Sequence, residues 1–249
     1  GGHTSSIVNT MEFITISTQG NSQDFGDMTS VASRGGALSS RTRGLRAGGQ
    51  TPSTINIIEF ITISSTGNAQ DFGDLNYTPK FPAPMANETR GIWAGGYTPS
   101  NSDNIEFVTI ASTGNSVDFG NMTSARNRQS GCASPTRGLM FGGASPSPSE
   151  AVEGLNIEFI TMASTGDATD YGDLTAAKYQ NVAVSNATRG IIFGGRTQPD
   201  GTNNIIDFVT IATLGNATDF GDNTTTQTSG GVSSPTRAVK LGGRISPAD

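Results

Sequence analysis

Residues 63–75 read ISSTGNAQDFGDL, and the Asp-Phe-Gly triplet near the end of this stretch recurs along the chain. The copies, one of them with tyrosine in place of phenylalanine, are Asp24-Phe25-Gly26, Asp71-Phe72-Gly73, Asp118-Phe119-Gly120, Asp170-Tyr171-Gly172 and Asp219-Phe220-Gly221. A catalytic aspartate is needed only once, whereas five copies at regular spacing indicate a repeated structural unit.

Other landmarks recur with the triplet. Thr-Arg-Gly begins at residues 42, 89, 136 and 188, and Thr-Arg-Ala begins at 236, so the steps are 47, 47, 52 and 48 residues. A double glycine follows each of them, and an acidic-aromatic pair such as Glu59-Phe60 comes next. Repeats of this length that contain several short strands are typical of propeller blades.

Each repeat contains four predicted strands, which we call a to d in chain order. Strand a is a stretch of small residues such as 181–185, strand b resembles 190–195, strand c resembles 156–161, and strand d carries the triplet. Strand c is apolar on both faces, as expected for a sheet packed between two neighbours. No window of a dozen residues has the apolar spacing of a helix.

The order of strands predicts how the chain ends meet. The chain starts in strands c and d and finishes in strands a and b, so one set of four is split between the termini. Pairing these halves would cover the two strand edges that an open array leaves exposed. We therefore predict one domain over residues 1–249: an all-β, five-bladed β-propeller with four antiparallel strands per blade, closed by N-terminal strands c and d pairing with C-terminal strands a and b.

Composition excludes several classes of protein. The formal net charge is −6 and no block rich in Lys or Arg is present, which argues against a nucleic-acid partner. No apolar run approaches the ~20 residues needed to cross a bilayer, so no membrane insertion is expected. The single cysteine, Cys132, and the single histidine, His3, exclude a Cys/His zinc site. We predict no metal and no cofactor.

Catalytic residues are not expected either. Asp-Phe-Gly is the magnesium-binding signature of protein kinases, but the glycine-rich loop, the lysine and the His-Arg-Asp loop of a kinase are missing. Glycoside hydrolysis needs two carboxylates ~5–10 Å apart. The predicted strands a, which would line the central channel, contain no Asp, Glu, His or Lys. The sequence therefore predicts a protein that is not an enzyme.

One set of repeated charges is predicted to be structural. The arginine of each Thr-Arg-Gly and the acid of each acidic-aromatic pair recur together, and we expect them to pair within or between blades. Binding of an anion by a ring of these arginines is the weaker alternative. The residues are Arg43, Arg90, Arg137, Arg189 and Arg237, with Glu12, Glu59, Glu106, Glu158 and Asp207.

Sequence variation among the repeats points to one face of the disc. Strands alternate in direction, so the b–c and d–a loops emerge on the same side, and these loops vary most, with the longest b–c loop at 144–156. Loops on a rigid scaffold commonly carry recognition. Ordinary solvated loops with drifted sequence would give the same variation. The candidate ligand-binding residues on this face are Tyr77, Lys80, Phe81, Tyr97, Arg126, Arg128, Lys178 and Tyr179.

The order Arg, Gly-Gly, acidic-aromatic resembles kelch repeats, with Phe or Tyr in place of the kelch tryptophan. The unit size is similar to that of tachylectin-2-type propeller lectins. The stretches IEFITISSTGNAQDFGDL at 58–75 and ASPTRGLMFGG at 133–143 resemble repeat proteins of marine cyanophages. This last resemblance covers essentially the whole chain, and it implies a virion structural or tail-fibre-like protein and hence a virion or extracellular location.

Two functions follow as expectations. The first is a lectin-like adhesin, a recognition module that binds a host-surface glycan, because aromatic rings stack on sugars while amides and cations bind hydroxyls or acidic groups. The second is a purely structural or decoration protein whose disc face contacts another virion protein. The first should have concave, aromatic-lined pockets, and the second a flat and partly apolar patch of ~800 Å² per partner.

Overall fold

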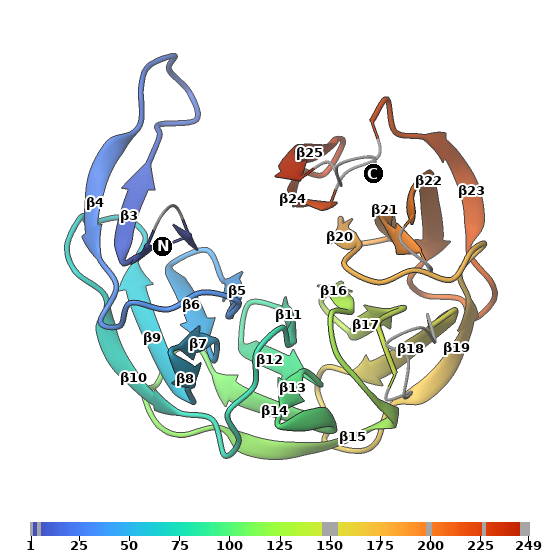
Figure 1. Ribbon diagram of the computed structural model, residues 1–249, viewed down its shortest axis with the longest axis horizontal. Coiled ribbons are helices and arrows are strands. Elements are labelled where there is room, and N and C mark those ends of the chain that lie inside the picture. The colour runs from blue at the N-terminus through green and yellow to red at the C-terminus, as the bar shows by residue number, and fades with distance from the viewer. Residues whose placement is uncertain (1, 4–5, 146–153, 198–200, 226–227, 245–249) are drawn as a thin grey trace.

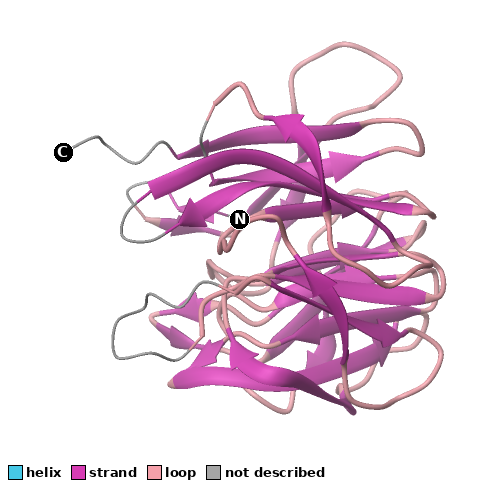
Figure 2. Cartoon of the chain, turned by 90° about the vertical axis from the view of Figure 1, so that its right-hand side faces the viewer, coloured by secondary structure: helices cyan, strands magenta, loops and turns pink. Residues whose placement is uncertain are grey.

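The protein consists of strands and loops. The computed structural model describes residues 2–3, 6–145, 154–197, 201–225 and 228–244, and within these ranges it contains no helix (Figure 2). Accordingly, none of the described segments is a helix long and apolar enough to cross a membrane. The all-β class and the antiparallel strands are confirmed. Short runs of β-branched and aromatic residues between glycine-containing turns explain the preference for strands.

Four antiparallel sheets with the same order of strands are arranged around a central axis (Figure 1). In each, strand a lies innermost and strand d outermost. Sheet 1 contains β5 (Gly36–Ser39), β6 (Arg43–Ala47), β9 (Ile57–Thr62) and β10 (Gln70–Asp74); sheet 2 contains β11 (Ala83–Ala86), β12 (Arg90–Ala94), β14 (Ser100–Thr109) and β15 (Val117–Arg126); sheet 3 contains β16 (Ser130–Ala133), β17 (Arg137–Phe141), β18 (Asn156–Thr161) and β19 (Thr169–Asp173); sheet 4 contains β20 (Val182–Ser185), β21 (Arg189–Thr197), β22 (Gly201–Thr210) and β23 (Thr218–Asp222).

The remaining strands form smaller units. Two hairpins lie at the ends of the arc: β3 with β4 at the N-terminal end and β24 with β25 at the C-terminal end. The strand β13 pairs with β14, and two further small pairs are β1 with β2 and β7 with β8. Their bounds are β1 (Gly2–His3), β2 (Ile7–Val8), β3 (Thr10–Phe13), β4 (Gln23–Asp27), β7 (Gln50–Thr51), β8 (Ser53–Thr54), β13 (Tyr97–Thr98), β24 (Thr228–Ser233) and β25 (Ala238–Arg244).

The repeated Asp-Phe-Gly triplet packs one strand against its neighbour. The aromatic ring of strand d meets the ring of the acidic-aromatic pair on strand c edge to face, an arrangement that stabilises aromatic pairs. Phe60 and Phe72 illustrate it, with ring centroids 5.8 Å apart at 82°. The other pairs are Phe13–Phe25, Phe107–Phe119, Phe159–Tyr171 and Phe208–Phe220. The triplet is therefore a packing motif.

The glycine of the triplet allows the next sheet to approach. Gly73 lies at a β-bulge with φ of 145°, and a Cβ atom there would clash with the Gly114 carbonyl in the c–d turn of sheet 2. The Gly114 N–H donates to the Phe72 carbonyl at 2.7 Å, and the Asn115 side chain accepts from the Asp74 N–H at 3.0 Å. The same turn-to-strand bond is made by Gly67 to Phe25, Gly166 to Phe119 and Gly215 to Tyr171.

The apolar core lies between adjacent sheets. One cluster joins Leu45 and Phe60 of sheet 1 with Trp93 and Val108 of sheet 2, and the indole N–H of Trp93 donates to the Gly36 carbonyl at 3.0 Å. Sheets 2 and 3 share a second cluster, and sheets 3 and 4 a third. Sheets 2 and 3 are thus buried on both faces, as the apolar pattern of strand c predicted, whereas sheets 1 and 4 each share a core cluster with one neighbouring sheet.

The predicted pairing of the Thr-Arg-Gly arginines with the repeated acids is wrong. Strand register places Arg43 opposite Thr62, whereas Glu59 lies opposite Arg46. Arg43 stacks on Phe60 at 4.6 Å and donates to the Ile110 carbonyl of sheet 2 at 2.7 Å. Two equivalent bonds join Arg90 to the Met162 carbonyl and Arg137 to the Ile211 carbonyl. These arginines connect neighbouring sheets, and their partners are carbonyl oxygens.

Four of the five repeated acids are buried and each of these has partners of its own, whereas Glu12 is exposed. Glu59 pairs with Arg46 at 2.6 Å, and Asp207 pairs with Lys178 at 2.6 Å. Glu158 pairs with Arg126. Glu106 instead accepts from the Ser116 hydroxyl and from the backbone N–H of Asn76. Burial of an unpaired carboxylate is costly, and the donors come both from the same sheet, as Arg46 does for Glu59, and from the preceding repeat, as Arg126 does for Glu158.

The predicted pairing of the N-terminal and C-terminal hairpins does not occur among the described strands. β3 pairs only with β4, and β24 pairs only with β25, at the two ends of an open arc (Figure 1). Each hairpin is held by its sequence neighbour: Gly26 meets Gly67 of sheet 1, and Ser233 donates to the Ser185 carbonyl of sheet 4. Every pairing that forms is local in sequence, whereas closure joins distant chain ends at a higher entropic cost.

Candidate functional site

The two kinds of variable loop lie against each other on one face. Single β-bridges connect a residue of four d–a loops with a residue of the following b–c loop. The pairs are Ser33 with Gln50, Lys80 with Tyr97, Asn127 with Ala144, and Tyr179 with Arg196. This confirms that the b–c and d–a loops share a face, and the bridges hold their backbones in place.

A polar pocket of about 460 Å³ opens between the loops of sheets 2 and 3. The Lys80 ammonium lies over the Tyr97 ring at 4.7 Å, a cation–π contact. Asn127 donates to Asn101 on the same wall. Aromatic surface, amide groups and two cations, Lys80 and Arg128, therefore meet in one concavity.

Four of the eight predicted ligand-binding residues line this pocket: Lys80, Phe81, Tyr97 and Arg128. The other four lie beneath the face. Arg126 and Lys178 are 2% and 0% exposed in their ion pairs, so they cannot meet a ligand there. Burial lowers the pKa of the Arg126 guanidinium, and the Glu158 carboxylate partly offsets this effect.

The two remaining tyrosines are part of the scaffold. The Tyr77 hydroxyl donates to the Gly95 carbonyl at 2.8 Å, and burial, with a smaller effect of Glu106, raises its pKa well above the usual value. Tyr179 is buried between the guanidinium groups of Arg128 and Arg196. The rings of Tyr77 and Tyr179 contact other residues of the protein. The loop sequence does not reveal this, because it does not show which side chains the fold buries.

A second cavity, of about 730 Å³, lies on the axis at the same face. Arg34, Phe81, Arg128 and Gln180 line it at the points where the d–a loops enter strands a. Arg34, Gln180 and, in the neighbouring pocket, Asn101 are not among the residues predicted from the sequence to bind a ligand. A signal for the first two does exist: these four bulky residues occupy the same position in successive repeats, just before a run of small residues.

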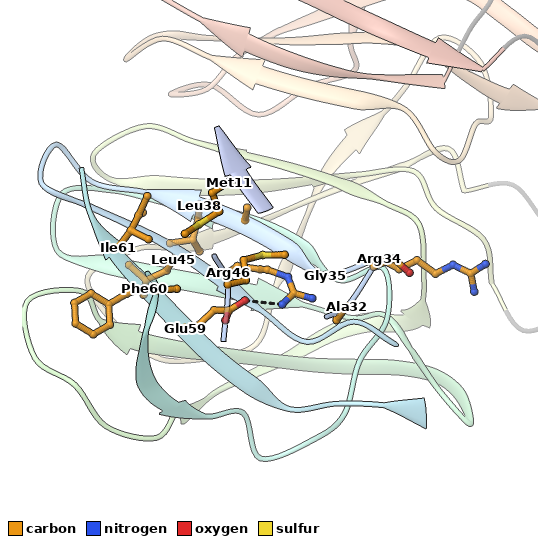
Figure 3. A pocket seen from close by; sticks show the side chains of 15 residues that line it. Met11, Ala32, Arg34, Gly35, Leu38, Leu45, Arg46, Glu59, Phe60 and Ile61 are labelled. Carbon is orange, nitrogen blue, oxygen red and sulfur yellow. Dashed lines mark hydrogen bonds and ion pairs between the residues drawn. The ribbon is translucent and has the colours of Figure 1, made fainter. Parts of the chain in front are cut away.

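A third cavity, of about 560 Å³, is apolar and lies between the N-terminal hairpin and sheet 1. Met11, Leu38, Leu45 and Ile61 border it, and the Arg46–Glu59 pair lies at its edge (Figure 3). This cavity lies on the face of sheet 1 that is directed toward the opening of the arc.

The longest b–c loop, 144–156, lies mostly outside the described residues. Within the described ranges no three His, Cys, Asp or Glu residues are grouped as a metal ion would require. No protein-family model matches the sequence, and no curated protein matches it.

Proposed function

We propose that the protein is a five-bladed propeller whose ring closes when β25 pairs with β3. Transfer of the β6–β9 register places Lys240 opposite Glu12 and Val239 opposite Phe13, as Arg46 lies opposite Glu59 and Leu45 opposite Phe60. Glu12 would then gain a cation, as three of the other four repeated acids have. Closure also covers two unpaired strand edges.

The apolar cavity beside sheet 1 supports this closure (Figure 3). At three junctions a side chain of strand a would meet a Cβ placed on the glycine of the next Thr-Arg-Gly: Leu38 at Gly91, Met85 at Gly138 and Cys132 at Gly190. The equivalent pair is Val232 with Gly44. Gly44 lines the cavity and Val232 is 53% exposed, so the C-terminal hairpin has the side chain that this cavity lacks.

A cross-link tests the closure. In a Cys132→Ser background, Glu12→Cys and Lys240→Cys should form a disulfide within one chain, because paired strands bring Cα atoms to the ~4.4–6.8 Å that a disulfide needs. Ser17→Cys with Lys240→Cys is the control and should not cross-link. Disulfide-linked dimers would show instead that a second copy takes the free edge, and absence of any cross-link would contradict closure.

We propose further that the protein is a non-enzymatic recognition module that binds glycans through its loop face. The pocket between sheets 2 and 3 carries this proposal, because Tyr97, Lys80, Asn101 and Arg128 combine an aromatic surface with hydrogen-bond donors in one concavity. Sites of this kind are mostly concave with a few placed polar groups. Display on a virus particle or another extracellular assembly would raise the avidity of weak sites by ~10²–10⁴.

A glycan array tests this function. Tyr97→Ala should abolish binding to the glycans that the wild-type protein binds on the array, because the exposed aromatic ring of the pocket is lost. Arg41→Ala is the control, since Arg41 is exposed among the a–b turns at the opposite end of strand a. A folded protein that binds no glycan would contradict the proposal and favour a decoration protein that contacts another protein.

A further inference from the structure

The mouth of the axial cavity is built from four residues in an unfavourable backbone conformation. Arg34, Phe81, Arg128 and Gln180 have φ of 67°, 59°, 57° and 52°, in the left-handed region that is unfavourable for residues other than glycine. Backbone strain of this kind persists only where the surroundings enforce it, and it is concentrated at functional sites. The same strained conformation recurs at one position in four repeats. We call these four residues the collar, and their repetition makes the collar a specific feature of the fold.

Hydrogen bonds join the collar around the axis. The Phe81 N–H donates to the Arg34 carbonyl at 2.8 Å, the Arg128 N–H to the Phe81 carbonyl at 3.4 Å, and the Gln180 N–H to the Arg128 carbonyl at 2.8 Å. Because each d–a loop is tied to the next one, the four side chains that line the cavity are held by a fixed backbone. Such preorganisation reduces the cost of binding a ligand.

The side chains of the collar place two positive charges at the cavity. The Phe81 ring lies between two guanidinium groups, with Arg34 at 5.3 Å and Arg128 at 5.2 Å from its centroid. Stacking occupies the faces of the guanidinium groups and leaves N–H donors at their edges. Arg34 uses one donor on Gln50 at 2.9 Å, while Nε of Arg128 is buried without a hydrogen-bond partner in the described part of the chain.

The charge of the cavity differs from that of the whole protein. The chain has a net charge of −6, yet among the described residues the lining of the axial cavity includes two arginines and no Asp or Glu. The other polar side chains of this lining are those of Gln129, Ser130, Gln180 and Asn181. This lining is suited to an oxyanion, because guanidinium groups bind carboxylates and sulfates through charge-assisted hydrogen bonds.

We propose that this cavity binds the carboxylate or sulfate group of an acidic polysaccharide, with Arg34 and Arg128 as the ligands of the anion and Phe81 as the residue that positions them. The proposal rests on the glycan-binding function above and specifies its ligand class. Phe81 and Arg128 line both the axial cavity and the neighbouring pocket with Tyr97. One sugar chain can therefore place a sugar ring beside Tyr97 and an acidic group on the axis.

Binding of three polysaccharides tests the proposal: heparin, which is sulfated, polygalacturonate, which is carboxylated, and dextran, which is neutral. Arg34→Gln and Arg128→Gln should each weaken binding of at least one acidic polymer about ten-fold, the loss of one charge-assisted hydrogen bond. Glutamine is a suitable replacement because Gln180 already adopts the same backbone conformation in this ring. The matched control, Arg41→Gln, removes an exposed positive charge from the opposite end of strand a.

The outcomes separate the inference from the proposed function. Loss with Arg34→Gln and Arg128→Gln but not with Arg41→Gln supports the axial site, and comparison of heparin with polygalacturonate identifies the anion. An equal loss of affinity in all three variants would mean that binding depends only on the overall charge of the protein, and it would overturn the axial site. Binding that depends on Tyr97 but not on the two arginines would overturn the axial site alone. Failure of a folded protein to bind any glycan would overturn both proposals.

Discussion

At four places, strand d of one repeat packs against the c–d turn of the next repeat. The fifth such junction, between the two ends of the arc, is open, although its strand d carries the same Asp-Phe-Gly motif. Phe72 is 2% exposed at a packed junction, whereas Phe220 is 56% exposed at the opening. Gly73 meets the backbone of the next turn, while Gly221 has no atom within 4 Å of the position of a Cβ. The aromatic ring of the motif is therefore buried only where a neighbouring repeat packs against it, as in other repeat folds.

The opening also separates groups that are paired elsewhere. Glu59, Glu106, Glu158 and Asp207 are buried with partners, but Glu12 of β3 is exposed and accepts from the Ser22 hydroxyl at 3.2 Å. Strand edges and apolar side chains left unpaired are prone to association. Closure within the chain and occupation by a second chain are the two ways to satisfy them, and variants at matched positions distinguish the two regions.

The largest expected difference concerns the buried ion pair of sheet 4. Lys178→Met should lower the free energy of unfolding by about 3–5 kcal/mol, because Asp207 stays buried without its cation. Lys240→Met should cost less than about 1 kcal/mol if the arc is open, since Lys240 is then partly exposed. Urea unfolding of the two variants measures both values. Equal losses would show that Lys240 is as deeply buried in solution as Lys178.

A smaller difference is expected for the glycine of the triplet. Gly73→Ala combines left-handed backbone strain with a clash against Gly114, and should cost about 2–4 kcal/mol. Gly221→Ala has the same strain, with φ of 135°, but no neighbour. It should therefore cost only ~1–2 kcal/mol if the arc is open. A loss as large as that of Gly73→Ala would mean that the turn at Gly20 reaches β23 and that the ring is closed.

Thiol reactivity compares equivalent positions of strand a. Cys132 is buried against sheet 4, and burial raises the pKa of its thiol to about 12, so the native protein should react with a thiol reagent only on unfolding. In a Cys132→Ser background, Val232→Cys should react at least ~10-fold more slowly in the native protein than in urea if the hairpin fills the apolar cavity. Reaction at the unfolded rate would mean that the cavity lacks this occupant.

Much of this arrangement follows from the sequence. The spacing of Thr-Arg-Gly and of the triplet predicts the strands and their order, because a repeat of this length allows only a few folds. Alternation of strand direction also predicts that the b–c and d–a loops share a face, as the bridge between Lys80 and Tyr97 confirms. These features depend on local pattern and on chain direction.

Other features depend on contacts that no repeat encodes. The acid of strand c takes its cation from strand b in sheet 1, through Arg46. In sheet 3 the cation is Arg126, at the end of strand d of sheet 2, and in sheet 4 it is Lys178, in the preceding d–a loop. Pairing by repeat position therefore assigned the wrong arginines, and two cations of variable loops were placed on the surface although they are buried. The collar at the axis was missed because its members differ in chemistry and share only a backbone conformation.

The smallest expected effect is the coupling between Glu12 and Lys240 across the opening. If β3 and β25 pair in the register of β6 and β9, these side chains meet as Arg46 and Glu59 do, and a double-mutant cycle with Glu12→Gln and Lys240→Met should give a coupling of about 0.5–1 kcal/mol. The coupling should decrease in high salt because the pair is partly exposed. Glu12→Gln with Arg41→Gln is the control cycle and should show no coupling. A coupling that depends on protein concentration would locate the contact between two chains, because only an intermolecular seam responds to dilution.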